Sequence, residues 1–169
     1  MKKILLIIVS ITLFHSLCFG SDIPNYNDGG YPVRFATLDK VKELNQRLSE
    51  LDSDVSGANL AGLVEYYSHE MFYRINTITK LLVLENIHSI YGQFCIPALQ
   101  AIRPYVLMEI GFFKRIPDEC NKAMGQSGTS PAEGVYFRKI MDVSRETLSL
   151  LQELAQELED VILAKQKIK

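Results

Sequence analysis

The sequence predicts an all-α protein, an irregular four-helix bundle that follows a cleaved signal peptide. Apolar residues recur at every third or fourth position along most of the chain after residue 37, which is the period of an amphipathic helix. Glycine, proline and asparagine gather between these stretches, and no stretch has the alternation of a β-strand. The N-terminus has the layout of an export signal, which is basic, then apolar, then small.

Residues 1–20 are predicted to be the signal peptide. The apolar run is too short to span a bilayer, which needs about 20 residues. Cys18 and Gly20 supply small residues before a cut after Gly20. Acylation of Cys18 and an uncleaved anchor are the alternatives, but acylation favours a small residue before the cysteine, and Leu17 is not small. We therefore expect a periplasmic or secreted protein with no stable membrane anchor after cleavage.

The mature chain is expected to begin with an irregular extension and to continue as one helical domain. Turn-forming residues mark the extension at 21–36, and the helical domain takes up 37–169. Thr37 can cap a first helix, which runs to a break at 52–59. A long helix follows from about 60 to 91. Its second half is apolar on nearly every side, which favours a central place in the bundle or half of a dimer interface.

Two further helices are expected in the C-terminal half. Pro97 can open the third helix, which we expect to be bent or broken at Pro104, because an internal proline removes a hydrogen bond and clashes with the preceding turn. This helix is expected to end near Pro117, before a short helical turn at 118–124. The segment Ser130-Pro131-Ala132-Glu133 is a capping box that starts the final helix. The near-heptad pattern of that helix could also pair two chains.

Cys95 and Cys120 remain after the signal is removed, and an even number of cysteines in an oxidising compartment predicts a disulfide. The Cα atoms of a disulfide lie within about 7 Å of each other. A straight helix over this stretch would separate its ends by roughly 30 Å. Pairing within one chain therefore requires a break or a sharp bend, for which Pro104 is the candidate. Free thiols and a bridge between two chains are the alternatives.

Composition and motifs exclude several classes of function. The mature net charge is −4, because the 18 basic residues lose Lys2 and Lys3 while all 20 acidic residues stay. A mildly acidic chain without a basic cluster argues against binding to nucleic acid or to an anionic membrane. The sequence has no glycine-rich phosphate loop, no Gly-x-Ser-x-Gly elbow, no Cys-x-x-Cys pair and no haem-attachment motif. We therefore expect no enzyme activity and no cofactor.

Glu85 and His88 form a Glu-x-x-His, the spacing found in carboxylate-bridged di-iron bundles. Such a site needs a second Glu-x-x-His, and the other mature histidine, His69, has Glu65 four residues before it. On one continuous helix His69 and His88 would lie roughly 28 Å apart, too far to share an ion. No metal site is predicted.

Glu109 lies in an otherwise apolar stretch of the expected third helix. A buried carboxylate needs a partner or a raised pKa. The favoured interpretation is a structural carboxylate paired with an arginine such as Arg74 or Arg103. The alternatives are a carboxylate that handles protons or binds a ligand, and one that is exposed to solvent.

Tyr66, His69, Glu70 and Tyr73 fall on one helical face at spacings of three, four and seven. Polar stripes rich in tyrosine suit protein interfaces, because tyrosine offers a large apolar area with a polar tip. The alternative is that these tyrosines border the core with their hydroxyls in solvent, and that His69 pairs with Glu65.

Three hypotheses of function follow. The first is an exported, non-catalytic helical module that binds a protein partner, of the inhibitor, immunity, chaperone or adaptor type. The second is a bundle that binds a small molecule or a metal and could be an enzyme, centred on Glu109 or on Glu85 and His88. The third is a structural homodimer of the cell envelope, built through the central and final helices.

Overall fold

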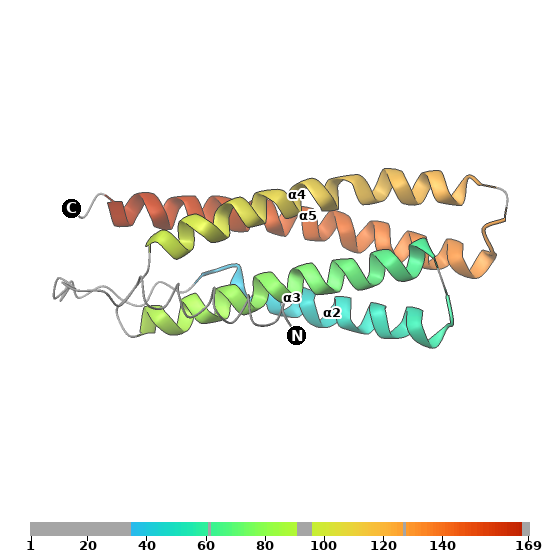
Figure 1. The fold of residues 1–169 in the computed structure, drawn as a ribbon, viewed down its shortest axis with the longest axis horizontal. Helices are drawn as coiled ribbons and strands as arrows, with labels where there is room; N and C mark the ends of the chain where they lie inside the picture. Colours follow the sequence, from blue (N-terminus) through green and yellow to red (C-terminus); the bar gives the residue numbers. More distant parts are fainter. Residues whose placement is uncertain (1–34, 61, 91–95, 127, 167–169) are drawn as a thin grey trace, which may run out of the picture.

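Four helices run side by side in alternating directions (Figure 1). The computed structural model describes residues 35–60, 62–90, 96–126 and 128–166. Its helices are α2 (Leu38–Gly57), α3 (Leu63–Ile90), α4 (Ile96–Met124) and α5 (Pro131–Gln166). None of the described residues lies in a β-strand, so the predicted all-α class is confirmed. The expected signal peptide, and the expected extension as far as residue 34, lie outside the described residues.

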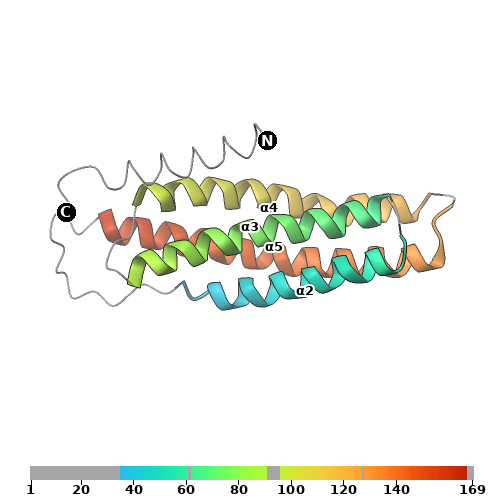
Figure 2. The same cartoon turned by 60° about the horizontal axis from the view of Figure 1, so that its bottom comes forward.

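The bundle is made of two helical hairpins, α2 with α3 and α4 with α5 (Figure 1). Contact is most extensive between α4 and α5, and next between α2 and α3. Helix α3 joins the two hairpins, because it contacts both α4 and α5; in Figure 2 it passes across α5. Helices α2 and α5 have the least contact of the packed pairs. The seam between α2 and α5 is therefore the most open side of the bundle.

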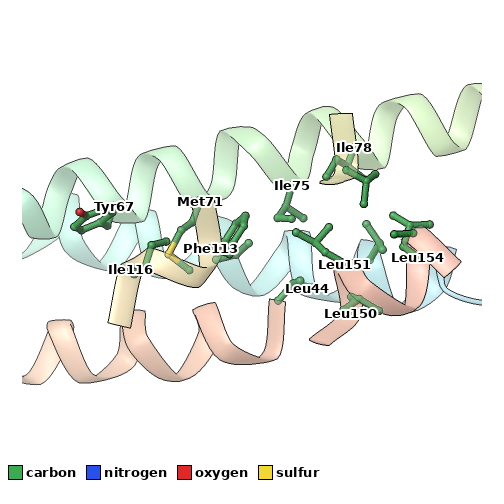
Figure 3. Close-up of a cluster of buried hydrophobic side chains, with 14 of the residues drawn as sticks. Leu44, Tyr67, Met71, Ile75, Ile78, Phe113, Ile116, Leu150, Leu151 and Leu154 are labelled. Atoms are coloured by element: carbon green, nitrogen blue, oxygen red, sulfur yellow. The ribbon is translucent and has the colours of Figure 1, made fainter. Parts of the chain in front are cut away.

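Apolar side chains at helical spacing form the core. In its centre Met71, Ile75 and Ile78 of α3 lie near Phe113 of α4 and Leu151 of α5 (Figure 3). Burial of one such side chain contributes about 1.5–3 kcal/mol. Tertiary packing of these stripes, more than intrinsic helix propensity, therefore holds the helices in place. Along α2 the buried residues are Leu38, Val41, Leu44, Leu48, Leu51 and Val55.

Helix α2 extends farther than predicted, because it continues through most of the expected break at 52–59 and ends at Gly57. Val55, within that segment, is fully buried, so the extra turn adds an apolar contact. The chain then reverses with Asn59 at a φ of 54° and Gly62 at a φ of 77°. These are left-handed conformations that asparagine and glycine adopt more readily than other residues.

The start of α2 is capped by a distant residue. Thr37, the predicted cap, makes no capping hydrogen bond with its own side chain. Instead Glu157 of α5 accepts hydrogen bonds from the backbone N–H groups of Ala36 and Thr37 and from the Thr37 hydroxyl. A carboxylate at this position satisfies donors that the helix leaves free and complements the positive end of its dipole. The cap therefore also ties α2 to α5.

Helix α4 is continuous from Ile96 to Met124, and Pro104 and Pro117 lie inside it. The predicted end near Pro117 and the separate turn at 118–124 are therefore wrong. The prediction at Pro104 is a bend or a break, and of these two the break is wrong. An internal proline costs about 3 kcal/mol or more. Fully buried side chains such as Phe113 lie along the same helix, and its contact with α5 is the most extensive in the bundle. Packing thus offsets the cost of both prolines.

The capping box at the start of α5 is confirmed. The Ser130 N–H donates to Glu133 Oε2 at 2.7 Å, and the Glu133 N–H donates to Ser130 Oγ at 3.2 Å. The hydrogen bond from the Ser130 backbone is the main cause of a lowered pKa at Glu133.

Helix α3 contacts each of the other three helices, as its apolar character suggests. It is not enclosed on every side, however, because Leu82 is fully buried while Leu84 is 51% exposed. The dimer alternative for this helix stays a prediction.

Candidate functional site

The residues of the predicted tyrosine stripe lie in the first half of α3. Tyr66 is 49% exposed and Tyr73 is 60% exposed. The His69 side chain is also exposed. Glu70 is half-buried, and its Oε2 accepts a hydrogen bond from Arg74 Nε at 3.0 Å. The stripe is therefore divided, because three members face solvent and the fourth is engaged with an arginine.

His69 lies beside Asp52 of α2, with 3.5 Å between Nδ1 and Oδ2, whereas the sequence suggested Glu65 as its partner. The buried hydroxyl of Ser68 donates to Asp52 Oδ1 at 3.0 Å. The carboxylate therefore lies between the hydroxyl and the imidazole. A catalytic triad has the opposite order, with the histidine between the hydroxyl and the acid.

Glu109 projects from α4 into the interior, where it is 1% exposed. Its Oε2 accepts a hydrogen bond from Arg74 Nη1 at 2.8 Å, so one of the two arginines named from the sequence is its partner. The other, Arg103, pairs with Glu159 of α5 at 2.5 Å. Burial lowers the pKa of Arg74, but hydrogen bonds to Glu109 and Glu70 outweigh it, so the pKa is raised. Arg74 therefore stays charged between two carboxylates.

The second oxygen of Glu109, Oε1, is buried and has no hydrogen-bond partner among the described residues. Tyr105 lies one helical turn before Glu109 on α4. The pKa of the Tyr105 hydroxyl is raised, first by burial and then by the charge of Glu109. The buried carboxylate of Glu109 therefore contributes to the raised pKa of Arg74 on α3 and to that of Tyr105 on α4.

A row of aromatic rings leads from the surface of α3 into the core. Tyr66 meets Tyr67 edge to face, with 5.2 Å between ring centroids, and Tyr67 lies 6.5 Å from Phe112. Phe112 in turn meets Phe113 at a right angle, 5.3 Å away. The buried Tyr67 donates its hydroxyl to Glu119 of α4. These contacts fix the exposed ring of Tyr66 against a rigid base.

A hollow of about 200 Å³ opens between α3 and α4 at this row. The Arg74 guanidinium stacks on the Phe112 ring inside it, 4.0 Å from the ring centroid. Pockets for small ligands usually have volumes of about 300–1,000 Å³. The hollow is therefore the size of a site for one side chain. Its lining consists of Tyr66, Tyr67, Arg74, Phe112, Arg115, Ile116 and Glu119.

A second hollow, of about 210 Å³, lies along the seam between α2 and α5. Ion pairs cross the seam, with Lys40 and Glu153 at 2.8 Å and Arg47 and Glu146 at 2.5 Å. The hydrogen bond to Glu146 is the main cause of a raised pKa at Arg47. These charged groups already satisfy one another, so the second hollow presents few free donors.

The other candidates do not form a site within the described part of the chain. Glu85 is buried, and the side chain of His88 lies outside the described residues. Among the residues that the structure describes, no three His, Cys, Asp or Glu side chains gather closely enough to hold a metal ion.

Cys120 is fully buried, and burial raises the pKa of its thiol to about 11. Cys95 lies outside the described residues, so its pairing with Cys120 stays a prediction. Of the break or sharp bend that this pairing requires, the break is absent from α4, which is one helix from Ile96 to Met124. From Ile96 to Cys120 the helix rises by roughly 36 Å.

The sequence pattern missed the α4 side of the hollow. Phe112, Arg115 and Glu119 recur at spacings of three and four, which marks one face of a helix. That spacing alone could not show that this face lies beside Tyr66 and Tyr67. The register between α3 and α4 is needed, and only the folded chain supplies it.

Comparison with models of known protein families, with curated proteins and with solved structures finds no match for this chain. Within the described ranges, no helix combines the length and the apolar character needed to cross a membrane.

Proposed function

We propose that this chain is an exported, non-catalytic helical module that binds a protein partner through its α3–α4 face. That face consists of Tyr66 and Tyr73 of α3, Phe112 and Arg115 of α4, and the hollow beside them. The observation that carries the proposal is the exposed Tyr66 at a hollow lined by two arginines and three aromatic rings, with the exposed Tyr73 seven residues farther along α3. Tyrosine and arginine are enriched among the residues that dominate binding energy at protein interfaces.

The rigidity of this face supports the proposal. Tyr67 is held by Glu119, and Arg74 is held by Glu70 and Glu109. Association is opposed by the entropy lost when side chains become ordered, at about 0.5–1.5 kcal/mol for each flexible side chain. A face whose base is already fixed loses less side-chain entropy on binding, so more of the energy of its contacts appears as affinity.

The size of the hollow favours a protein partner over the second hypothesis, a bundle that encloses a small molecule. About 200 Å³ is below the usual range for a ligand pocket. The carboxylate on which that hypothesis centred, Glu109, is occupied by Arg74 through one oxygen. A single side chain of a partner fits this space, with the tyrosines in contact around it.

Site-specific photo-crosslinking in the native cell tests the α3–α4 face. A photoreactive phenylalanine analogue would replace Tyr66 or Tyr73, and as a control Leu163 of α5, an exposed apolar residue on another helix. We expect one discrete crosslinked protein from both tyrosine positions and none from Leu163. Tyr66→Ala with Tyr73→Ala should abolish association with that protein while the helical circular dichroism is kept. Equal crosslinking from Leu163, or association that survives the double substitution, would contradict the proposal.

Export is tested separately by the mass of the protein in the cell envelope. Cleavage after Gly20 gives a mature chain that begins at Ser21. Full-length protein confined to the cytoplasm would contradict export and leave the binding face to be judged by crosslinking alone.

A further inference from the structure

We infer that the hollow of the α3–α4 face receives an acidic side chain of the protein partner, between Arg74 and Arg115. The inference rests on the proposed function, because it assigns the chemistry of the group that the partner would insert.

Arg74 supplies a fixed positive group at the base of the hollow. A guanidinium has five N–H donors. Nε and Nη2 face Glu70, and Nη1 donates to Glu109 at 2.8 Å. Each terminal nitrogen carries two hydrogens, so one on Nη1 and one on Nη2 stay available. The carboxylates hold the group in place and leave donors for a third acceptor.

Arg115 supplies the second positive group. Of the six arginines in the described ranges, those at positions 47, 74, 103 and 145 each form an ion pair. Within the same ranges Arg115 and Arg138 form none, and of these two only Arg115 lines the hollow. Its planar guanidinium suits bidentate binding of a carboxylate. An acidic side chain in the hollow would give Arg115 the partner that the described residues do not provide.

The charges argue against a cationic side chain in the same place. An aromatic site for a cation needs a free ring face. One face of Phe112 is already covered by Arg74 at 4.0 Å. The lining carries two positive groups and one negative group, Glu119, which already accepts the hydroxyl of Tyr67. Glu70 and Glu109 are bound to Arg74, and neither lines the hollow.

A random-peptide display library selected on the mature protein tests this inference. We expect the enriched peptides to share an aspartate or glutamate at one position. Changing that residue to its amide in a synthetic peptide should weaken binding by about tenfold or more, because a charge-assisted hydrogen bond is lost.

Substitutions of Arg115 in the protein test the same contact from the other side. Arg115→Ala should weaken binding of the acidic peptide by a similar factor and should change binding of the amide peptide little. Arg115→Glu should favour a lysine version of the peptide. The matched control is Arg138→Glu, which changes an exposed arginine of α5 and should leave binding unchanged.

The outcomes separate this inference from the proposed function. Peptides that need Tyr66 and Tyr73 but tolerate the change from acid to amide would overturn the acidic partner and leave the binding face intact. Peptides that need the acid but are insensitive to Arg115→Ala would also overturn the inference. Enrichment of no peptide, or of peptides insensitive to the tyrosines and to Arg115, would count against both.

Discussion

Arg74 connects the interior of the bundle with its surface. It forms an ion pair with a carboxylate that is 1% exposed, and its other side stacks on Phe112 at the hollow. The desolvation of a buried ion pair often cancels its Coulomb attraction, so such a pair need not add stability. Removal of one partner is different, because the other charge is left buried and unpaired. The role of this ion pair is therefore to fix the position of the Arg74 guanidinium at the hollow.

A double-mutant cycle tests this view of Arg74 and Glu109. Arg74→Met should lower the free energy of unfolding by about 3–5 kcal/mol, because Glu109 loses its partner. Arg74→Met with Glu109→Leu should recover most of that loss, because no fully buried charge remains and the half-buried Glu70 still reaches solvent. Urea unfolding followed by circular dichroism measures both. The control is Arg145→Met, which breaks an exposed pair with Asp142 and should cost about 1 kcal/mol or less. A double variant as unstable as Arg74→Met would contradict the argument.

Cys120 is a second residue whose environment sets its chemistry. Its thiol has a folded-state pKa of about 11, raised first by burial and then by the charge of Glu119. In an unfolded chain a cysteine has a pKa of about 8.5. The folded state therefore keeps the proton at pH values where the unfolded state loses it. This contribution to stability is complete below the unfolded pKa and is lost as the pH rises toward the folded one.

We therefore expect the wild-type protein to lose stability faster than Cys120→Ala above about pH 8.5, by about 1–3 kcal/mol in total. Urea unfolding of both proteins at a series of pH values measures the difference, and the comparison cancels the contributions of the other titrating groups, which both proteins share. Profiles that stay parallel with reductant present would contradict a buried thiol. Profiles that diverge only after reductant is added would identify a disulfide.

At the scale of the element, α4 marks the limit of what local sequence could predict. The missing N–H and the ring of proline correctly predict a local free-energy cost at Pro104 and Pro117. The helix continues because the packing of α4 against α5 exceeds that cost, and such packing depends on residues far apart in the chain. Helical periodicity and the capping box at Ser130 were predictable, because both are local. The cap of α2 was not, because Glu157 comes from another helix.

The continuity of α4 makes Pro104→Ala a stabilising substitution. Pro104 is exposed and lies within the helix, so alanine restores a hydrogen bond and removes a clash without opening a cavity. The loss of proline's restriction on the unfolded chain opposes this by about 0.4–1 kcal/mol. We expect a net gain of about 1–2 kcal/mol in the free energy of unfolding. A broken helix at Pro104 would instead give no gain, and urea unfolding distinguishes the two.

The exposed part of the candidate site was predictable on α3 only. The spacing of Tyr66 and Tyr73 marks an exposed face of α3, and Glu109 stands out as a carboxylate among apolar residues. The part played by Arg115 depends on which face of α4 meets α3. No local pattern contains that information, because it arises from the register of two helices packed against each other.

At the scale of the whole molecule, the two hairpins differ in how firmly they are held. Helices α4 and α5 share the most extensive contact, whereas α2 packs on α3 and has little contact with α5. The ion pairs that cross from α2 to α5 are about half exposed. Such pairs contribute about 0–1 kcal/mol each. The main interactions that hold α2 in place are therefore its buried apolar side chains and the cap from Glu157.

Regions with fewer buried contacts open at lower free energy than the rest of a protein. We therefore expect native-state hydrogen exchange to show α2 opening at the lowest free energy of the four helices, and the core of α4 and α5 at the highest. Glu157→Ala should lower the opening free energy of α2 by a further 1–2 kcal/mol or so, because the first N–H groups lose their acceptor. Glu153→Ala, which removes only an exposed ion pair from the same seam, is the matched control and should have a smaller effect. If all four helices exchange at one free energy, and Glu157→Ala lowers them equally, the bundle opens as a single cooperative unit and the distinction between the hairpins is wrong.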